Sequence, residues 1–197
     1  LALHVRVVCP DVVGRGRSDW LADPMAYAVP TYLADMVTLL ARLNARTVDW
    51  VGTSMGGLIG LGVAAQPGSP LRRLVLNDVG PTIEPAALAR IGQYLGKVER
   101  WPSLEAAADA LWTISSGFGP HTRAQWLALT EPLLKRDGDA FVLRYDPDVA
   151  VPARALTPEL ARQHEALLWA AWDRLRLPVL LLRGAESDLL SPAMAQA

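Results

Sequence analysis

Four short apolar runs with little polar alternation stand out along the chain. They cover residues 4–10, 47–52, 73–78 and 178–184, and each is rich in Val or Leu. Strands whose side chains are buried on both faces have this pattern, which is typical of parallel sheets. The sequence therefore predicts four strands of a mostly parallel sheet that is covered on both faces.

Helical periodicity separates the first three of these runs. Residues 30–43 begin with Pro30 and repeat apolar side chains every three or four positions, which predicts an amphipathic helix. Residues 55–65 are apolar on all sides and rich in Gly, which disfavours helices, so we expect this helix to be buried closely against the sheet. The alternation of strands and helices predicts an α/β fold with helices flanking the sheet.

The hydrophobic pattern changes after the third run, where helical periodicity dominates and no strong strand pattern is found. The helices expected in this region cover residues 85–98, 103–114, 122–136 and 157–175. A helical block between two strands of one sheet indicates a cap inserted into a core. The sequence therefore predicts a core formed by residues 1–82 and 176–197 and a helical cap formed by residues 83–175.

Composition narrows the function classes. Of the 197 residues 51% are hydrophobic and 20% are charged, and the net charge is −1, which gives no electrostatic basis for binding nucleic acid or an anionic membrane. No apolar run approaches the roughly 20 residues that a membrane-spanning helix needs. The single Cys9 suits a reducing compartment, so a cytoplasmic location is expected. No spacing of His, Cys or carboxylate residues resembles a metal site, and no cofactor is expected.

The motif GTSMG at residues 52–56 lies between a predicted strand and a Gly-rich predicted helix, and it fits G-x-S-x-G. A sharp strand-to-helix turn of this kind lifts the hydroxyl of Ser54 clear of the sheet. Gly52 and Gly56 are expected there because bulky side chains two residues on either side of the serine would collide. The backbone N–H of Met55, at the helix N-terminus, can point at a developing oxyanion. The motif therefore predicts Ser54 as a nucleophile.

A serine nucleophile needs a base, which is normally a histidine that a carboxylate orients. Two carboxylates follow predicted strands: Asp188 in RGAESD and Asp78 in LVLND. In doubly wound sheets functional groups gather beyond the carboxyl ends of the strands, and both residues qualify. We favour Asp188 as the acid, because Asp78 precedes VGP, which is typical of a turn. Asp78 stays the alternative acid.

Four segments occur in order and with suitable spacing: PDVVGRGRSDW, VGTSMGG, LVLNDVGP and PVLLLRGAESDLL. Together they resemble the α/β-hydrolase superfamily, in the branch with a serine nucleophile and a helical cap. The resemblance implies that Ser54 is the nucleophile, Asp188 the acid and Met55 one oxyanion donor. It also implies a catalytic histidine after the acid and a second oxyanion donor in a loop after the third strand of the family's sheet.

None of the three histidines fits the position that the resemblance implies for the base. His4 opens a predicted strand, His164 lies on a charged helix face, and His121 follows GFGP in the predicted cap. We therefore expect the base beyond Ala197 and the second oxyanion donor before Leu1. The sequence is expected to be truncated at both ends, and these 197 residues alone are expected to be inactive.

For the full-length protein, the resemblance implies hydrolysis of a carboxylic ester, lactone or thioester of a small, largely apolar substrate through an acyl-enzyme. Two alternatives stay open. One is a carbon–carbon bond hydrolase or cofactor-free perhydrolase on the same triad, and the other is a non-catalytic member that binds a small ligand. The predicted cap holds five of the seven Trp residues, and some of these would line an apolar pocket. The partner is expected to be a small molecule, and the oligomeric state does not follow from the sequence.

Overall fold

The structure is a computed structural model that describes residues 2–196. It divides into two compact units. Unit 1 contains residues 2–24 and 96–149, and unit 2 contains residues 25–95 and 150–196. This division does not test the predicted cap over residues 83–175, which stays a prediction.

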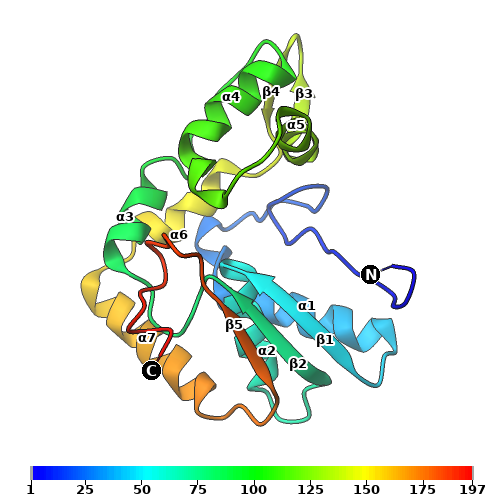
Figure 1. Cartoon of the computed structure of the whole chain (residues 1–197), viewed down its shortest axis with the longest axis vertical. Helices are drawn as coiled ribbons and strands as arrows, with labels where there is room; N and C mark the ends of the chain where they lie inside the picture. The colour runs from blue at the N-terminus through cyan, green and yellow to red at the C-terminus, as the bar shows by residue number, and fades with distance from the viewer. Residues whose placement is uncertain (1, 197) are drawn as a thin grey trace. The chain divides into compact units, whose positions relative to one another are not determined.

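Unit 2 is built on a three-stranded parallel sheet with the strand order β1-β2-β5. Its main elements are α1 (Val29–Leu43), β1 (Val48–Thr53), α2 (Met55–Ala64), β2 (Leu71–Asn77), α3 (Pro85–Gly92), α6 (Val151–Arg154), α7 (Pro158–Trp172) and β5 (Val179–Leu182). The 3-10 helices η1 (Pro24–Ala26) and η4 (Pro147–Ala150) lie where the two units join in sequence. Helix α2 packs against β1 and β2, and both α1 and α7 contact α2 (Figure 1). These elements confirm the predicted α/β class and three of the four predicted strands.

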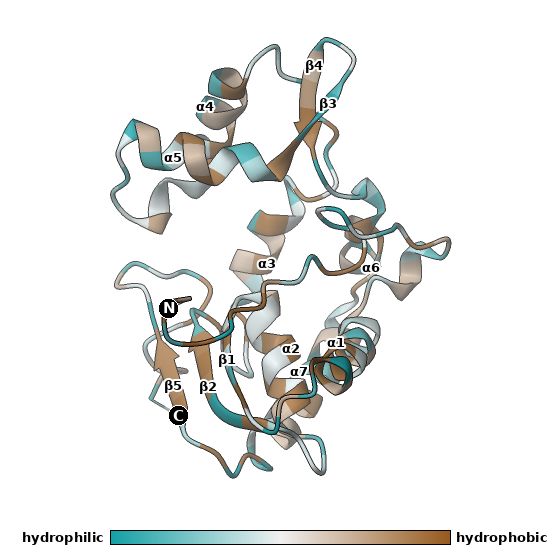
Figure 2. Cartoon of the chain, turned by 90° about the vertical axis from the view of Figure 1, so that its right-hand side faces the viewer, coloured by the Kyte–Doolittle hydropathy of each residue, from teal (hydrophilic) through white to brown (hydrophobic). Residues whose placement is uncertain are grey.

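One face of this sheet forms the core of unit 2. Leu74, Leu76 and Val79 are each 1% exposed and form its centre. Leu58 of α2 and Trp172 of α7 pack against them. Strand β5 and much of β2 are strongly hydrophobic (Figure 2). Burial of these side chains by α2 and α7 supplies the main apolar stabilisation of the unit.

The opposite face carries a second apolar row. Val51, Val75 and Leu180 are aligned in register across the three strands. Val51 is 72% exposed and Leu180 is 54% exposed. The prediction of burial on both faces is therefore wrong for residues 2–196, because only one face has a packing partner among them.

Residues 4–10 form no strand, contrary to the prediction from their apolar pattern. Val5, Val7 and Val8 are 55%, 47% and 43% exposed. A strand requires a neighbour that pairs with its backbone N–H and C=O groups. Among residues 2–196, β1 pairs only with β2, so this segment has no strand beside it. The apolar pattern alone does not form a strand.

Unit 1 combines helices with a β-hairpin. Its elements are α4 (Leu104–Ser115), η2 (Ser116–Phe118), α5 (Arg123–Thr130), η3 (Glu131–Leu133), β3 (Leu134–Asp137) and β4 (Ala140–Leu143). The antiparallel pair β3–β4 shows that the expectation of no strand in residues 83–175 is wrong. The helix predicted over residues 122–136 is also too long, because α5 ends at Thr130 and β3 begins at Leu134. Gly138, at φ 63°, lies in the two-residue turn, where positive φ favours glycine.

The core of unit 1 lies between the hairpin and α4. Trp101, Ala107 and Leu134 are its buried residues, and Phe141 packs against them. Trp101 and Phe141 also exchange two backbone hydrogen bonds, of 2.9 Å and 2.7 Å. The hairpin is thus joined to the segment before α4 by both side-chain packing and backbone pairing.

Two helices of unit 1 begin where the sequence predicts. The side-chain oxygen of Ser103 accepts the N–H of Ala106, and that of Thr122 accepts the N–H of Gln125, so each caps its helix. In unit 2, α3 ends at Gly92, earlier than the predicted residue 98. Within the described residues, no helix is both long and apolar enough to span a membrane.

Candidate active site

Ser54 lies between β1 and α2 in a backbone conformation that non-glycine residues rarely adopt. Its φ is 50° and its ψ is −122°. Its N–H donates to the carbonyl of Asn77 on β2 at 3.2 Å, and its own carbonyl accepts the N–H of Gly57 at 2.8 Å and that of Leu58 at 3.2 Å. The neighbouring strand and the first turn of α2 therefore hold the strained turn in place.

Close packing of α2 on the sheet explains two of the glycines around Ser54. A Cβ on Gly52 would lie 2.3 Å from the carbonyl oxygen of Gly56, and a Cβ on Gly57 would lie 2.5 Å from Cγ1 of Val79. The steric reason given for Gly56 is wrong, because a Cβ there meets nothing within 4 Å among the described residues. The second constrained glycine is Gly57, for which the adjacent Gly-Gly pair is the only sequence signal.

Trp50 fixes the same junction from the strand side. Its indole N–H donates to the carbonyl of Gly56 at 2.9 Å. A Cβ on Gly60 would lie 2.4 Å from the indole nitrogen, so the ring lies directly against the backbone of α2. The first turns of α2 are thereby positioned against β1 by one hydrogen bond and by close contact.

The turn leaves a hydroxyl and a backbone donor side by side. The Ser54 side chain is half-buried, and its hydroxyl has no hydrogen-bond partner within residues 2–196. Met55 is the first residue of α2, where backbone N–H groups have no acceptor inside the helix. The positive end of the helix dipole also favours negative charge at this place. Chemically, this arrangement can present a nucleophile beside an oxyanion donor.

Asp78 follows β2 and connects it to the loop after β5. Its backbone N–H donates to the carbonyl of Leu182 at 2.8 Å. Its Oδ1 accepts the N–H of Gly184 at 3.0 Å, and its Oδ2 accepts the hydroxyl of Ser187 at 2.8 Å. Both carboxylate oxygens therefore hold the loop that precedes Asp188.

Asp188 lies at the end of that loop in an exposed ion pair. Its Oδ2 accepts Nε of Arg90 at 2.7 Å, and its Oδ1 accepts Nη2 at 2.9 Å. The side chains of Asp188 and Arg90 are 57% and 44% exposed. The hydrogen bonds from the Arg90 guanidinium lower the pKa of Asp188 and raise that of Arg90. The carboxylate is therefore held ionised, and no pattern in the sequence indicated Arg90 as its partner.

The structure brings the three predicted polar residues to one edge of the sheet. Ser54 follows β1, Asp78 follows β2 and Asp188 lies beyond β5, and these strands are parallel neighbours. Backbone and side-chain bonds connect successive strand ends, from Ser54 to Asn77 and from Asp78 to Gly184. Ser54 itself makes no hydrogen bond to either carboxylate.

The histidines have separate environments. His4 and His164 are exposed. In unit 1, Nδ1 of His121 lies 3.0 Å from the carbonyl of Gly119, and its ring centroid lies 6.0 Å from that of Trp126. Among the residues that the structure describes, no three His, Cys, Asp or Glu side chains gather in a way that could hold a metal ion.

The aromatic residues of the predicted cap are divided between the two units. In unit 1, Trp101 and Trp126 are buried, and the Trp126 indole donates to the carbonyl of Ala108 at 2.7 Å. In unit 2, the Trp169 indole donates to the hydroxyl of Thr82 at 3.1 Å. These contacts are structural, and a role of the remaining aromatic residues in a substrate pocket stays a prediction.

The chain is similar to known hydrolases over nearly its full length. The family described as alpha/beta hydrolase fold matches residues 1–196. A 3-hydroxybutyrate-oligomer hydrolase of Cupriavidus necator is 55% identical over 189 residues, which make up 94% of this chain and 64% of that protein. A 2-hydroxy-6-oxo-2,4-heptadienoate hydrolase of Pseudomonas putida is 37% identical over 85 residues, which make up 43% of this chain and 30% of that protein.

A solved structure agrees with these matches. The crystal structure of an alpha/beta hydrolase from Novosphingobium aromaticivorans is similar with a TM-score of 0.82 and 33% identity, and the match covers 95% of this chain and 66% of that one. The chain therefore spans somewhat less than two thirds of the length of the Cupriavidus necator and Novosphingobium aromaticivorans proteins.

Proposed function

Because the chain belongs to the α/β-hydrolase fold family, we propose that it carries the nucleophile and the acid of a serine hydrolase that cleaves carboxylic esters. The observation that carries this proposal is the backbone of Ser54, a non-glycine residue at φ 50° on a strand-to-helix turn. Strain of this kind persists only where the surrounding structure holds it, and it gathers at functional sites.

The proposed reaction uses Ser54 twice. Its Oγ attacks the ester carbonyl carbon, the C–O bond to the alcohol breaks, and the Ser54 proton leaves with the alcohol. Water then attacks the acyl-enzyme, which releases the carboxylic acid and returns a proton to Ser54. The N–H of Met55 stabilises the oxyanion formed in each step. The proton passes through a base, and we assign that role to a histidine that this sequence does not include.

We assign Asp188 to orient this base. Its ionised state suits a group that must stabilise a positively charged imidazole. Both carboxylates accept hydrogen bonds at both oxygens. Those of Asp78 come from the loop that carries Asp188, whereas those of Asp188 come from one exposed side chain, that of Arg90, so we propose Asp78 as the weaker candidate. Asp78 instead positions that loop.

The proposed substrates are short oligoesters of a hydroxy acid. The Cupriavidus necator relative is named for 3-hydroxybutyrate oligomers, in which ester bonds join the hydroxyl of one unit to the carboxyl of the next. Its 55% identity over 94% of this chain is the strongest support for this class. Cleavage of a carbon–carbon bond is the second candidate, which the shorter match to the Pseudomonas putida hydrolase supports.

The test uses the full-length protein with p-nitrophenyl butyrate and the 3-hydroxybutyrate dimer. Ser54→Ala should lower kcat/KM for both by at least about 10³-fold, because no other group replaces the nucleophile. Ser116→Ala, at an exposed serine, is the matched control and should retain activity. Retained hydrolysis in Ser54→Ala would exclude the serine mechanism. Absence of hydrolysis in the wild type would favour the binding-only alternative.

A second pair of variants separates the two acids. Asp188→Asn should lower kcat by about 10²–10⁴-fold with little change in stability, because the base loses its orienting charge. Asp78→Asn should mainly lower stability, by about 1 kcal/mol, because its amide cannot accept the hydroxyl of Ser187 in the same way. Steady-state kinetics and urea denaturation of both variants distinguish these effects, and the reverse pattern would assign the acid to Asp78.

A further inference from the structure

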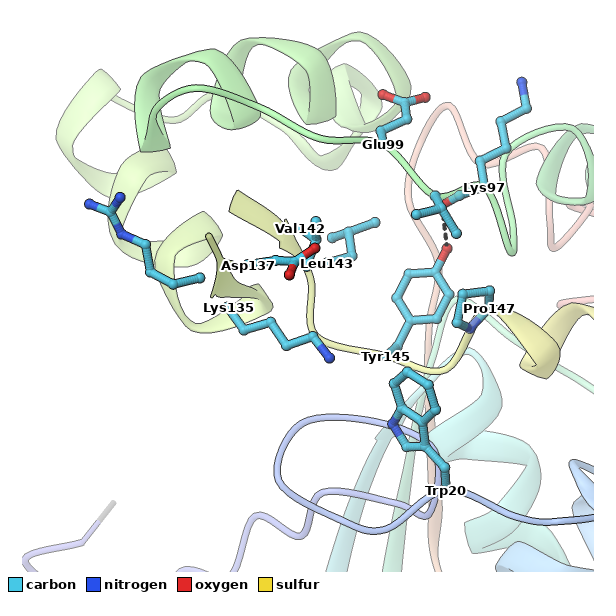
Figure 3. A pocket seen from close by; sticks show the side chains of 11 residues that line it. Trp20, Lys97, Glu99, Lys135, Asp137, Val142, Leu143, Tyr145 and Pro147 are labelled. Carbon is cyan, nitrogen blue, oxygen red and sulfur yellow. Dashed lines mark hydrogen bonds between the residues drawn. The ribbon is translucent and has the colours of Figure 1, made fainter. Parts of the chain in front are cut away.

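Unit 1 contains a cavity of about 330 Å³ that the proposed mechanism does not use. Its walls come from the β3–β4 hairpin, from the segment that follows β4, from residues 97–99 and from Trp20 (Figure 3). This volume suits a small organic molecule. All of its lining residues belong to unit 1, so the cavity is complete within that unit.

Much of the cavity wall is apolar and one part of it is fixed by hydrogen bonds. Val142, Leu143 and Pro147 supply aliphatic surface. The hydroxyl of Tyr145 accepts the N–H of Gly96 at 3.0 Å and donates to the carbonyl of Lys97 at 3.3 Å. The Tyr145 ring is therefore held in place and presents its face as a rigid part of the wall.

Lys135 brings a positive charge to the cavity wall beside Trp20. Its ammonium lies 4.9 Å from the centroid of the Trp20 ring, and it forms no ion pair with a described residue. In Figure 3 the Lys135 side chain extends toward Trp20 and Tyr145, whereas the ammonium of Lys97 points away from these rings. A contact with an aromatic face orients an ammonium group without neutralising it. Lys135 therefore remains able to accept an anion.

The other charged residues of the cavity wall do not cancel the charge of Lys135. The carboxylate of Asp137 is bound by Arg100, which also donates to the Asp137 carbonyl at 2.8 Å. The guanidinium of Arg136 lies 4.3 Å from the centroid of the Phe141 ring and stays positively charged as well. The carboxylate of Glu99 points away from the Tyr145 ring (Figure 3). The uncompensated charge inside the cavity is thus positive.

We propose that this cavity binds the carboxylate end of a short aliphatic acid, with the carboxylate on Lys135 and the carbon chain against Trp20, Val142 and Leu143. The inference rests on the proposed function for its substrate class, since an oligoester of a hydroxy acid ends in such a carboxylate. A charged group at one point and apolar walls elsewhere match a molecule with one anionic end. The rigid Tyr145 and the oriented Lys135 lower the cost of ordering on binding.

The first arm of the test measures binding without turnover. The full-length Ser54→Ala protein is titrated with 3-hydroxybutyrate and with the dimer acid by calorimetry. Lys135→Gln should weaken binding by about tenfold, which corresponds to the loss of one charge-assisted contact. Lys135→Arg should retain most of it. Arg17→Gln is the control, because it removes one positive charge from an exposed side chain of unit 1 that does not line the cavity, and it should change the affinity less than twofold.

The second arm measures selectivity in binding. The Ser54→Ala protein should bind the dimer acid more tightly than its methyl ester, and Lys135→Gln should lower this preference by about tenfold. Equal affinity and equal selectivity with and without Lys135→Gln, or equal losses in Arg17→Gln, would overturn the proposal. If no variant hydrolyses an ester but Lys135→Gln alone weakens binding, the proposed function fails and the carboxylate site stands.

Discussion

The two faces of the β1-β2-β5 sheet have similar sequences and opposite surroundings. On one face, Leu74 and Leu76 are each 1% exposed beneath α2 and α7. On the other, Val51 is 72% exposed and Leu180 is 54% exposed, although they lie in register across the same strands. An apolar side chain contributes to stability only where a second element covers it. The apolar strand pattern therefore shows that both faces can pack against another element. The position of α2 and α7 determines which face is buried.

This difference has a direct consequence for the candidate site. The covered face is the one on which α2 approaches the strands closely enough to exclude a Cβ at Gly52 and Gly57. That close approach also holds the turn at Ser54. Packing of the covered face is thus part of what presents the hydroxyl.

The largest expected effect is on the stability of the covered face. Leu74→Ala should lower the free energy of unfolding of the 197-residue chain by about 2–5 kcal/mol, because it leaves a cavity beneath α2. The matched Leu180→Ala on the open face should change it by less than about 0.5 kcal/mol. Urea denaturation followed by circular dichroism measures both. Equal losses would contradict the contrast between the faces and would mean that the Leu180 row is also covered.

The two glycines of the turn should also differ in how much a substitution changes stability. Gly52→Ala should destabilise by about 1–3 kcal/mol, because its Cβ would overlap the backbone of α2. Gly56→Ala should be neutral or stabilising by up to about 1 kcal/mol, because its Cβ enters open space on a helix. Thermal unfolding compares the two variants. A larger loss of stability for Gly56→Ala would support the original expectation that both glycines of the G-x-S-x-G motif are needed for steric reasons.

The features that sequence predicts here depend on near neighbours in the chain. The turn at Ser54, the strand before it and the helix caps at Ser103 and Thr122 follow from residues a few positions apart. The ion pair of Asp188 joins residues 98 positions apart, and nothing local indicates it. All four strands were predicted from apolar runs. Three of these runs pair with a neighbouring strand, whereas residues 4–10 have no strand beside them and form none.

The sequence analysis missed the β3–β4 hairpin for a different reason. Its strands are short, and the apolar periodicity of the preceding helix obscures them, although Gly138 follows Asp137 as a turn signal. The cavity of unit 1 could not be predicted from the sequence either, because Trp20 and Lys135 come together only after the chain has folded. The G-x-S-x-G motif predicts Ser54 as a nucleophile, whereas only the structure shows which side chains line the cavity.

The strain at Ser54 should be measurable as a smaller stability effect. Ser54→Gly should be more stable than Ser54→Ala by on the order of 1 kcal/mol, because glycine adopts φ 50° without steric cost. Both variants lack the Ser54 hydroxyl, so the comparison isolates the effect of the backbone conformation. Their urea midpoints at equal slope provide the measurement. A more stable Ser54→Ala would show that the turn is not strained, and the observation behind the proposed nucleophile would be lost.

The smallest effect concerns the exposed carboxylate of Asp188. Arg90→Gln should raise the Asp188 pKa, which carboxyl NMR titration follows directly, because the hydrogen bonds that lower it are removed. A pKa that is lower in the folded than in the unfolded protein stabilises above the unfolded value, and this stabilisation is lost as the pH falls through the folded value. Arg90→Gln should therefore cost less than about 1 kcal/mol near neutral pH and nothing in acid.

The pair Arg72–Asp49 is the control for this prediction, since it is exposed as well and its hydrogen bonds also lower the Asp49 pKa. Arg72→Gln should raise the Asp49 pKa and leave that of Asp188 in place, with the reverse selectivity for Arg90→Gln. An Asp188 pKa unchanged in Arg90→Gln would show that the ion pair does not form in solution. The loop after β5 would then still be held by Asp78 and by Arg183, which donates to the carbonyls of Leu190 and Ala185, and the proposed acid would be free to turn toward its base.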